Sequence, residues 1–416
     1  MANINGVNFK KGKVGANRLG SDDAISGIIL TGPKPTGIEF STPTTVYNID
    51  DAESLGITRE YDTANNVNVF EHISEFFRFA PSGTELHLII EEQTKKLVDL
   101  CADPAKKLMT AADGKIKQLA VGLNLPVAAT ITLLNGVPDD VYNAIAKAKE
   151  LEEWSENNFM PVSVFLEGYA YGGNAASSAN LRDLENLSAE GVTLVIGQDY
   201  DIASKKTGHA QKYAFIGTVL GVCASSTVNQ NIGENETKNL THESKKLLVN
   251  PGLSNHKTIK EQYFDLQTLE NKGYVFGLAY TGMAGVRLNN DHVCSPIILD
   301  ADNNINEHTV AYGRTAKKVR RLLRTVYLPK VKTDPAVNPE TGKLLPGVVV
   351  AYEAIGDGVF ADMERAGEIS GGKTYIDKDS DVIVAKVLNV GFKIIPKGNI
   401  GEISGTVNLK TQLKNE

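Results

Sequence analysis

The sequence predicts an α/β fold with a mainly parallel sheet, followed by a smaller α+β part. Two observations support this prediction. Through the first two hundred residues, apolar runs of strand length alternate with segments of helical periodicity, the pattern of helices that cover a parallel sheet. After about residue 285 the pattern changes to a basic helix, a turn-rich segment and strands with alternating apolar residues.

In the first part, each expected strand is a short apolar run, and several end at turn residues such as Gly32-Pro33 or Pro81-Ser82-Gly83. The expected helix at 68–79 places Val69, Ile73 and Phe76 on one face. The expected strands are Ile25–Leu30, Leu86–Ile90, Lys117–Leu123, Val162–Leu166 and Val192–Ile196, and the expected helices are Asn68–Phe79, Val141–Asn157, Leu181–Ala189 and Tyr213–Val228.

The C-terminal part begins with a helix at about 310–327, and Pro329 and further turn residues follow it. A strand at Val348–Ala354 and a short helix at Val359–Ala366 come next. Two strands separated by a turn at 396–399 close the chain. Their alternating residues are Leu388, Val390, Phe392 and Ile394 in one strand and Ile403, Gly405, Val407 and Leu409 in the other.

Composition narrows the class of protein. A chain of 416 residues predicts two or three packed units, and a net charge of −7 argues against a general nucleic-acid binder. Three scattered cysteines fit neither a disulfide scaffold nor a zinc site. The longest apolar stretch, about Ala214 to Ala224, is too short to span a bilayer, and the N-terminus has no apolar signal segment. We therefore expect synthesis in the cytoplasm and no membrane insertion.

No catalytic signature is visible in the sequence. It contains no GxxxxGK[ST], HExxH or GxSxG motif, and no GxGxxG follows an expected strand. His72 and His87 stand alone, and lone histidines are usually structural. Asp199 and Asp201 follow a strand end, where α/β enzymes place ligands, but no nucleophile or phosphate loop accompanies them. We expect no enzyme activity, no metal and no cofactor.

One helix concentrates positive charge. Between His308 and Thr333 there is no acidic residue, and apolar residues at three- and four-residue spacing form a stripe along the segment. The helix is either an ordinary solvated surface helix or a docking face for an acidic partner, with nucleic acid a weaker option. Its cations are Arg314, Lys317, Lys318, Arg320, Arg321 and Arg324.

The N-terminus carries an isolated strand. Val7 and Phe9 alternate with Asn8 and Lys10, and no turn folds this strand back on a nearby partner. Because an isolated strand leaves backbone groups unpaired, we expect it to pair with a distant segment or with another chain.

In the order of its motifs, the sequence resembles the contractile-tail sheath family of phages, prophages and phage-derived injection systems. The resemblance covers most of the chain, in the stretches 41–93, 213–233 and 269–409. In the first, Asp51-Ala52 precedes Gly56, and an amphipathic helix ends in Phe76-Phe77 before a strand. The Thr-Pro-Gly-Val opening of the family is missing, with Ile4–Val7 in its place, and residues 111–210 match only in their strand–helix rhythm.

The resemblance implies four parts: an N-terminal arm (1–20), an outer α/β domain (21–285), an inner domain (286–395) and a C-terminal arm (396–416). It also implies that arms add strands to neighbouring subunits. The strand residues expected to do so are Val7, Phe9, Ile403, Val407 and Leu409. The basic helix is then the candidate face for an acidic inner tube.

The function that the resemblance implies is mechanical. Copies of the chain would polymerise helically around an inner tail tube protein and contract to drive the tube through a cell envelope. The other partners would be baseplate and terminator proteins, in a virion tail or an injection particle assembled in bacteria. The alternatives are another self-assembling tail component, such as a terminator or baseplate protein, and an α/β enzyme.

Overall fold

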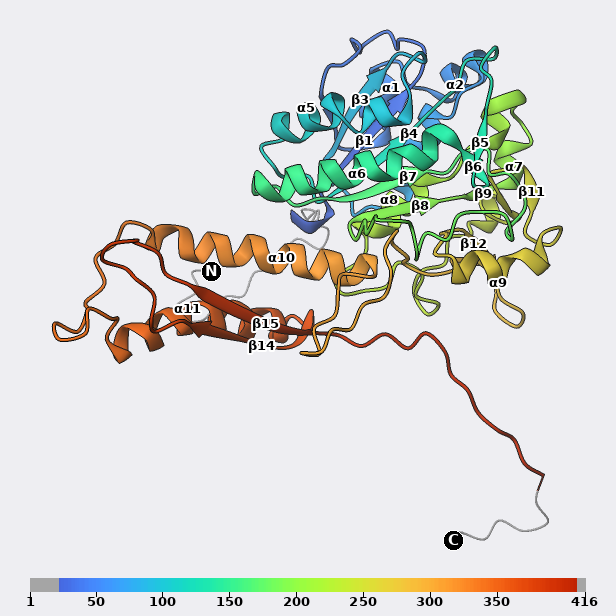
Figure 1. The fold of residues 1–416 in the computed structure, drawn as a ribbon. Coiled ribbons are helices and arrows are strands. Elements are labelled where there is room, and N and C mark those ends of the chain that lie inside the picture. The colour runs from blue at the N-terminus through green and yellow to red at the C-terminus, as the bar shows by residue number, and fades with distance from the viewer. Residues whose placement is uncertain (1–21, 410–416) are drawn as a thin grey trace, which may run out of the picture. The chain divides into compact units, whose positions relative to one another are not determined.

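The computed structural model describes residues 22–409 (Figure 1), so the expected strand at Val7 and Phe9 lies outside the described residues. The chain divides after Pro329 into two compact units. The sequence predicts the boundary between the outer and inner domains at 285/286. The observed division between the two compact units comes later in the chain, because the helix at 310–327 belongs to the first unit. The four-part division expected from the sequence stays a prediction.

A six-stranded sheet forms the centre of the first unit and confirms the predicted α/β fold. The strand order is β2-β3-β1-β4-β7-β8, and all neighbours run parallel except the edge strand β2. Each of the five parallel strands is buried over its whole length, which explains their continuous apolar runs. The strands are β1 Ser26–Thr31, β2 Thr44–Val46, β3 Leu86–Glu91, β4 Gln118–Gly122, β7 Ser163–Glu167 and β8 Val192–Val195.

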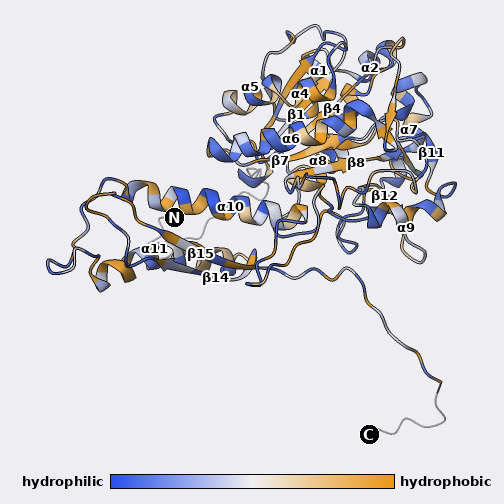
Figure 2. Ribbon diagram, viewed as in Figure 1, coloured by the Kyte–Doolittle hydropathy of each residue, from blue (hydrophilic) through white to orange (hydrophobic). Residues whose placement is uncertain are grey.

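Helices cover both faces of this sheet. Alternate side chains of one strand enter opposite cores, as Ile28 and Ile29 do in β1. Figure 2 shows the apolar residues concentrated on these strands. One face packs against α4 Leu97–Leu100, α5 Asp103–Ala111 and α6 Asp139–Asn157. The other packs against α1 Ile49–Ser54, α2 Arg59–Asn65, α3 Val69–Phe79 and α8 Ile216–Ala224.

Short elements complete the first unit, which ends with the long helix α10 Val310–Tyr327. The helix expected at Leu181–Ala189 is wrong: the segment forms turns, and the Arg182 side chain donates hydrogen bonds to the carbonyl oxygens of Ser295 and His308. The remaining elements are β5 Leu133–Leu134, β6 Val137–Pro138, β9 Gly197–Asp199, α7 Tyr200–Ala203, β10 Pro251–Leu253, β11 Lys257–Thr258, α9 Tyr263–Asn271, β12 Gly277–Ala279 and β13 Val286–Leu288, with short 3₁₀ helices that include η1 Asp22–Ala24.

The second unit consists of a helix and a two-stranded antiparallel sheet: α11 Pro346–Arg365, β14 Ile369–Ile376 and β15 Val390–Pro396. The strand expected at Val348–Ala354 is wrong, because these residues form the first part of α11. Pro346 stands at the start of that helix, where its missing N–H costs nothing. The small core of the unit includes Phe360 and Met363.

The three cysteines, Cys101, Cys223 and Cys294, are buried and unbridged. Within residues 22–409, none of the helices has both the length and the apolar character needed to cross a membrane.

Candidate assembly surfaces

The basic helix α10 forms as predicted, with its apolar stripe turned inward. Thr309 caps its N-terminus by accepting a hydrogen bond from the backbone N–H of Tyr312 at 3.1 Å. Val319 and Leu323 in the middle of the stripe are buried. Amphipathic periodicity therefore located this helix correctly from sequence alone.

Two of the six cations do not lie on an exposed face, which corrects the expectation for Arg314 and Lys317. Arg314 is 4% exposed and donates hydrogen bonds to the backbone oxygens of Ser226 and Thr227. Lys317 is 1% exposed, and its Nζ lies 2.5 Å from Oε1 of Glu152 in α6. These two side chains hold α10 against the rest of the first unit and are not available to a partner.

Lys318 and Arg321 share one carboxylate, which lies near the beginning of the first unit's sequence. Both lie close to Asp23 in η1, at 2.7 and 2.9 Å. Burial alone would raise the pKa of Asp23, but the two cations outweigh it and hold that pKa below its usual value. The carboxylate is therefore ionised at neutral pH and neutralises part of the positive face.

The last two cations also have partners in the first unit. Arg320 is paired with Glu307 at 2.6 Å and with Glu156 at 2.8 Å. Burial would lower its pKa, but these two carboxylates raise it above the ordinary value. The Arg324 guanidinium lies 3.4 Å from the centre of the Phe159 ring. Each of the six cations thus has a partner within residues 22–409 that the sequence reasoning missed. These partners are carboxylates, backbone carbonyls or an aromatic ring, and they lie up to 298 positions away in the chain.

The C-terminal segment carries the expected pattern of apolar residues but forms no strand within its own described chain. Ile403, Val407 and Leu409 are 88%, 92% and 101% exposed. Exposed apolar side chains gathered in one segment are typical of interaction surfaces. The arm residues predicted here are therefore accessible, and their pairing with another subunit stays a prediction.

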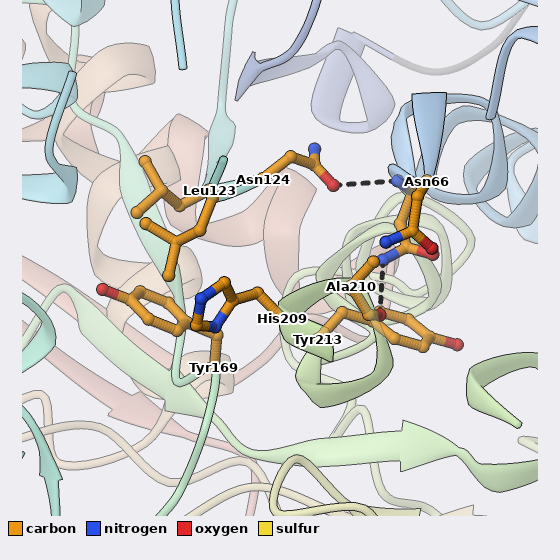
Figure 3. A pocket seen from close by; sticks show the side chains of 9 residues that line it. Asn66, Leu123, Asn124, Tyr169, His209, Ala210 and Tyr213 are labelled. Carbon is orange, nitrogen blue, oxygen red and sulfur yellow. Dashed lines mark hydrogen bonds between the residues drawn. The ribbon is translucent and has the colours of Figure 1, made fainter. Parts of the chain in front are cut away.

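The position where α/β proteins bind ligands is filled by the chain itself. It lies at the carboxyl ends of β1 and β4, where the strand order reverses. The Asn124 side chain bridges these ends, since its Nδ2 donates to the Thr31 carbonyl at 2.8 Å. Its Oδ1 accepts a hydrogen bond from the Asn68 N–H at 2.8 Å (Figure 3). The remaining hollow beside it encloses about 10 Å³, room for about one water molecule.

The N-terminus of α3, which borders the same position, is also occupied. The Asp62 carboxylate accepts the backbone N–H groups of Phe70 and Glu71, both at 3.0 Å. Burial raises the Asp62 pKa to about 6 despite these hydrogen bonds. A helix N-terminus that could hold a phosphate is therefore satisfied by an internal carboxylate. Among residues 22–409, no group of three His, Cys, Asp or Glu side chains could hold a metal ion.

The fold is one that solved sheath and baseplate proteins of contractile injection systems share. The chain belongs to the DUF2586 family, because the DUF2586 N-terminal domain matches residues 4–292. No curated protein matches the chain.

Among solved structures, the chain resembles a component of the anti-feeding prophage (AFP) baseplate, with 11% identity, a TM-score of 0.59 and coverage of 99% of this chain and 100% of the other. It also resembles the AFP helical sheath in its contracted state, with 12% identity, a TM-score of 0.54 and full coverage of both chains. A third neighbour is the sheath complex of the extracellular contractile injection system PVC in its contracted state, with 12% identity, a TM-score of 0.50 and 99% coverage of both chains. At such low identity, these matches establish the shared fold.

Proposed function

We propose that this chain is the sheath subunit of a contractile tail or phage-like injection particle and that it polymerises helically around an inner tube. The observation that carries the proposal is the match over the whole of both chains to the AFP helical sheath. A structural role also agrees with the ligand position of the α/β sheet being filled by Asn124 and Asp62. On this proposal the chain is not an enzyme and needs no cofactor.

Strand exchange is the proposed means of polymerisation. The C-terminal residues 403–409, with the strand at Val7 and Phe9, would extend the β14–β15 sheet of neighbouring subunits. Main-chain hydrogen bonds supply affinity in such contacts, and alternate side chains set the register. A head-to-tail contact that does not close produces a ring stack or a helical tube. An exchanged strand would also tether subunits to one another while they rotate and slide during contraction.

The proposal also includes a contact between α10 and an acidic inner tube. The cations proposed to make this contact are mainly Arg320 and Arg324. Arg320 is 43% exposed in its side chain, and exposed ion pairs contribute only about 0–1 kcal/mol. An acidic partner could therefore compete with Glu156 and Glu307 for this guanidinium. Reversing Arg320, Arg321 and Arg324 to Glu would then weaken co-sedimentation with the tube, and tube binding equal to that of the wild type would contradict the contact.

In this proposal the subunit is made in the bacterial cytoplasm and is assembled there into a virion tail or an injection particle. Baseplate and terminator proteins would cap the two ends of the sheath. Neither nucleic acid nor membrane insertion has a part in the mechanism.

The test is the assembly state of the purified full-length chain beside a version lacking residues 1–20 and 398–416. Negative-stain microscopy should show tubes or stacked rings for the full chain and monomers for the shortened one. Fluorescence of Trp154, the only tryptophan, verifies that both versions are folded. Closed rings of fixed size would favour a terminator or baseplate protein. Identical monomers of both versions at high concentration would contradict strand exchange.

A further inference from the structure

The chain around α10 separates its negative and positive charges. Between Arg287 and Arg314 the sequence contains no lysine or arginine, and between His308 and Thr333 it contains no acidic residue. An acidic hairpin, residues 297–305, precedes the helix, and a basic segment, residues 328–332, follows it. Opposite charges at the two ends of one helix indicate two surfaces that complement each other.

The acidic hairpin exposes an apolar face beside its carboxylates. Leu299 and Ile305 form an antiparallel bridge, so their side chains share one face, and Ile297 lies two residues before Leu299 on that face. Ile297, Leu299 and Ile305 are 69%, 66% and 46% exposed. Asp300 and Asp302 in the turn are exposed as well. Aliphatic side chains gathered in this way are typical of an interaction surface.

Hydrogen bonds fix the shape of the acidic hairpin. In the turn, the Asp300 carboxylate accepts the backbone N–H groups of Asp302 at 2.9 Å and of Asn304 at 2.7 Å. The hydrogen bonds from Asn304 hold the pKa of Asp300 below its ordinary value, so this carboxylate is ionised at neutral pH. At the base, Asn306 Nδ2 donates to Glu190 Oε1 at 3.1 Å. A surface that is already ordered loses little conformational entropy when it binds.

The basic segment has the complementary composition. Leu328 and Val331 are 54% and 61% exposed. Lys330 and Lys332 are exposed beside them, and Pro329 restricts the backbone of the segment. The segment therefore offers two aliphatic side chains and two cations, the counterpart of the apolar face and the two carboxylates of the acidic hairpin.

The acidic hairpin is too short to reach the basic segment of its own chain. The helix α10 between them is continuous over 18 residues, a length of about 27 Å (Figure 1). A hairpin of this size extends at most about 13 Å from its base. The acidic inner tube proposed above would repel Asp300 and Asp302, so the tube does not fit the acidic hairpin either.

We propose that the acidic hairpin of one copy docks on the basic segment of a second copy. Its apolar face would cover Leu328 and Val331, and its two carboxylates would lie beside Lys330 and Lys332. Because the two surfaces lie at opposite ends of α10, the contact is head-to-tail and propagates from copy to copy. This inference rests on the proposed function, to which it adds a side-chain contact that involves neither terminal arm.

Charge reversal and rescue in the full-length chain test this contact. The hairpin variant carries Asp300→Lys and Asp302→Lys, and the segment variant carries Lys330→Glu and Lys332→Glu. Sedimentation measures the protein concentration that each variant requires for assembly. Each variant alone should require at least a fivefold higher concentration than the wild type, because like charges then face each other across the contact.

An equimolar mixture of the two variants should assemble as the wild type does, because every hairpin then finds a segment of opposite charge on the other variant. The matched control carries Lys257→Glu and Lys260→Glu, the same change of charge as the segment variant at exposed positions elsewhere. It should assemble at the concentration of the wild type. Fluorescence of Trp154 verifies that all variants are folded.

Other outcomes would overturn the contact. Unchanged assembly of both variants excludes it and leaves the proposed function intact. An effect of only one variant assigns that surface to another partner, such as the tube or the basic residues 1–20, and overturns the pairing. Rescue by all four substitutions in one chain, without rescue in the mixture, overturns the second copy as the partner. A wild type that forms no assembly at all overturns the proposed function together with this contact.

Discussion

The ammonium group of Lys317 is buried in the first unit, 2.5 Å from the carboxylate of Glu152. Glu152 also accepts a hydrogen bond from the Gly191 N–H at 3.1 Å, so this carboxylate joins α10 to the loop before β8. A buried ion pair adds little net stability, but removing one partner leaves an uncompensated charge. Lys317 therefore attaches α10 to the first unit and has no part in a tube-facing surface.

Lys317→Met should lower the free energy of unfolding of the first unit by about 1.5–3 kcal/mol, because the partly buried Glu152 carboxylate then loses the cation with which it is paired. Urea unfolding followed by Trp154 fluorescence measures the loss. The matched control is Lys147→Met, whose exposed partner is Glu150, with an expected change below about 0.5 kcal/mol. Equal effects of the two variants would contradict the role assigned to Lys317.

Glu167 makes the stability of the first unit depend on pH. It is 1% exposed and accepts the N–H groups of Leu123 and Ala214, at 2.7 and 2.9 Å. Burial raises its pKa from 4.5 to about 7, so the folded chain retains a proton that the unfolded chain releases. The stabilising contribution is complete below pH 4.5 and is lost as the pH rises through 7.

Glu167→Gln should remove this part of the pH dependence. Between pH 4.5 and pH 8 the wild type should lose up to about 3 kcal/mol that the variant does not lose. At pH 4.5 the variant is less stable by about 1–3 kcal/mol, because the amide nitrogen leaves one backbone N–H without an acceptor. Unfolding free energies at four pH values test this, and parallel curves for the two proteins would contradict it.

At the scale of elements, hydrophobic periodicity correctly predicted those helices and strands that are determined by the local sequence pattern. The strands at 86–91 and 163–167 and the helix at 310–327 agree with prediction to within a residue or two. The segment Val348–Ala354 is predicted as a strand, but it lies in α11, although it begins with three β-branched valines. Glu353 and Asp357 make the difference, since their hydrogen bonds to β14 require a helix here, and no short-range signal shows it.

The candidate site was predictable to a similar degree. The position of α10 and its two faces could be predicted, because both follow from the 3.6-residue spacing of its apolar side chains. It did not give the partners of the cations, since Asp23 and Glu156 come from distant elements. Strand β14 was missed because Gly371-Gly372 interrupt its apolar alternation.

The Asp357 carboxylate closes the outer edge of β14 by accepting a hydrogen bond from the Thr374 N–H at 2.8 Å, and Asp357→Ala should open that edge. The Thr374 N–H then loses its acceptor, at a cost of about 1–3 kcal/mol to the second unit, and the exposed edge can pair with other chains. Light scattering of the chain lacking 398–416 should show concentration-dependent association that the unsubstituted shortened chain lacks. Asp362→Ala is the control on the same helix, because its pair with Arg365 is exposed on both sides. Association by the control variant as well would argue against edge closure.

At the scale of the whole molecule, the two units differ in how much they bury. The first has two extensive cores on either side of a six-stranded sheet. The second has one helix, two strands and a small core around Phe360, and a two-stranded sheet is marginal in water. Local opening is therefore easier in the second unit, and an added strand would stabilise it most.

Amide hydrogen exchange should resolve this difference residue by residue. In the free subunit the Ile394 amide, which faces away from β14 on the outer edge of β15, should exchange fast, whereas the Thr374 amide is slowed by its bond to Asp357. In the assembled particle the Ile394 amide should become at least tenfold slower, since an arm strand then accepts its hydrogen bond. The Ile29 amide in the central sheet should be protected in both states and serves as the reference. Equal exchange of Ile394 before and after assembly would mean that no strand joins β15, and polymerisation would then depend on side-chain contacts elsewhere.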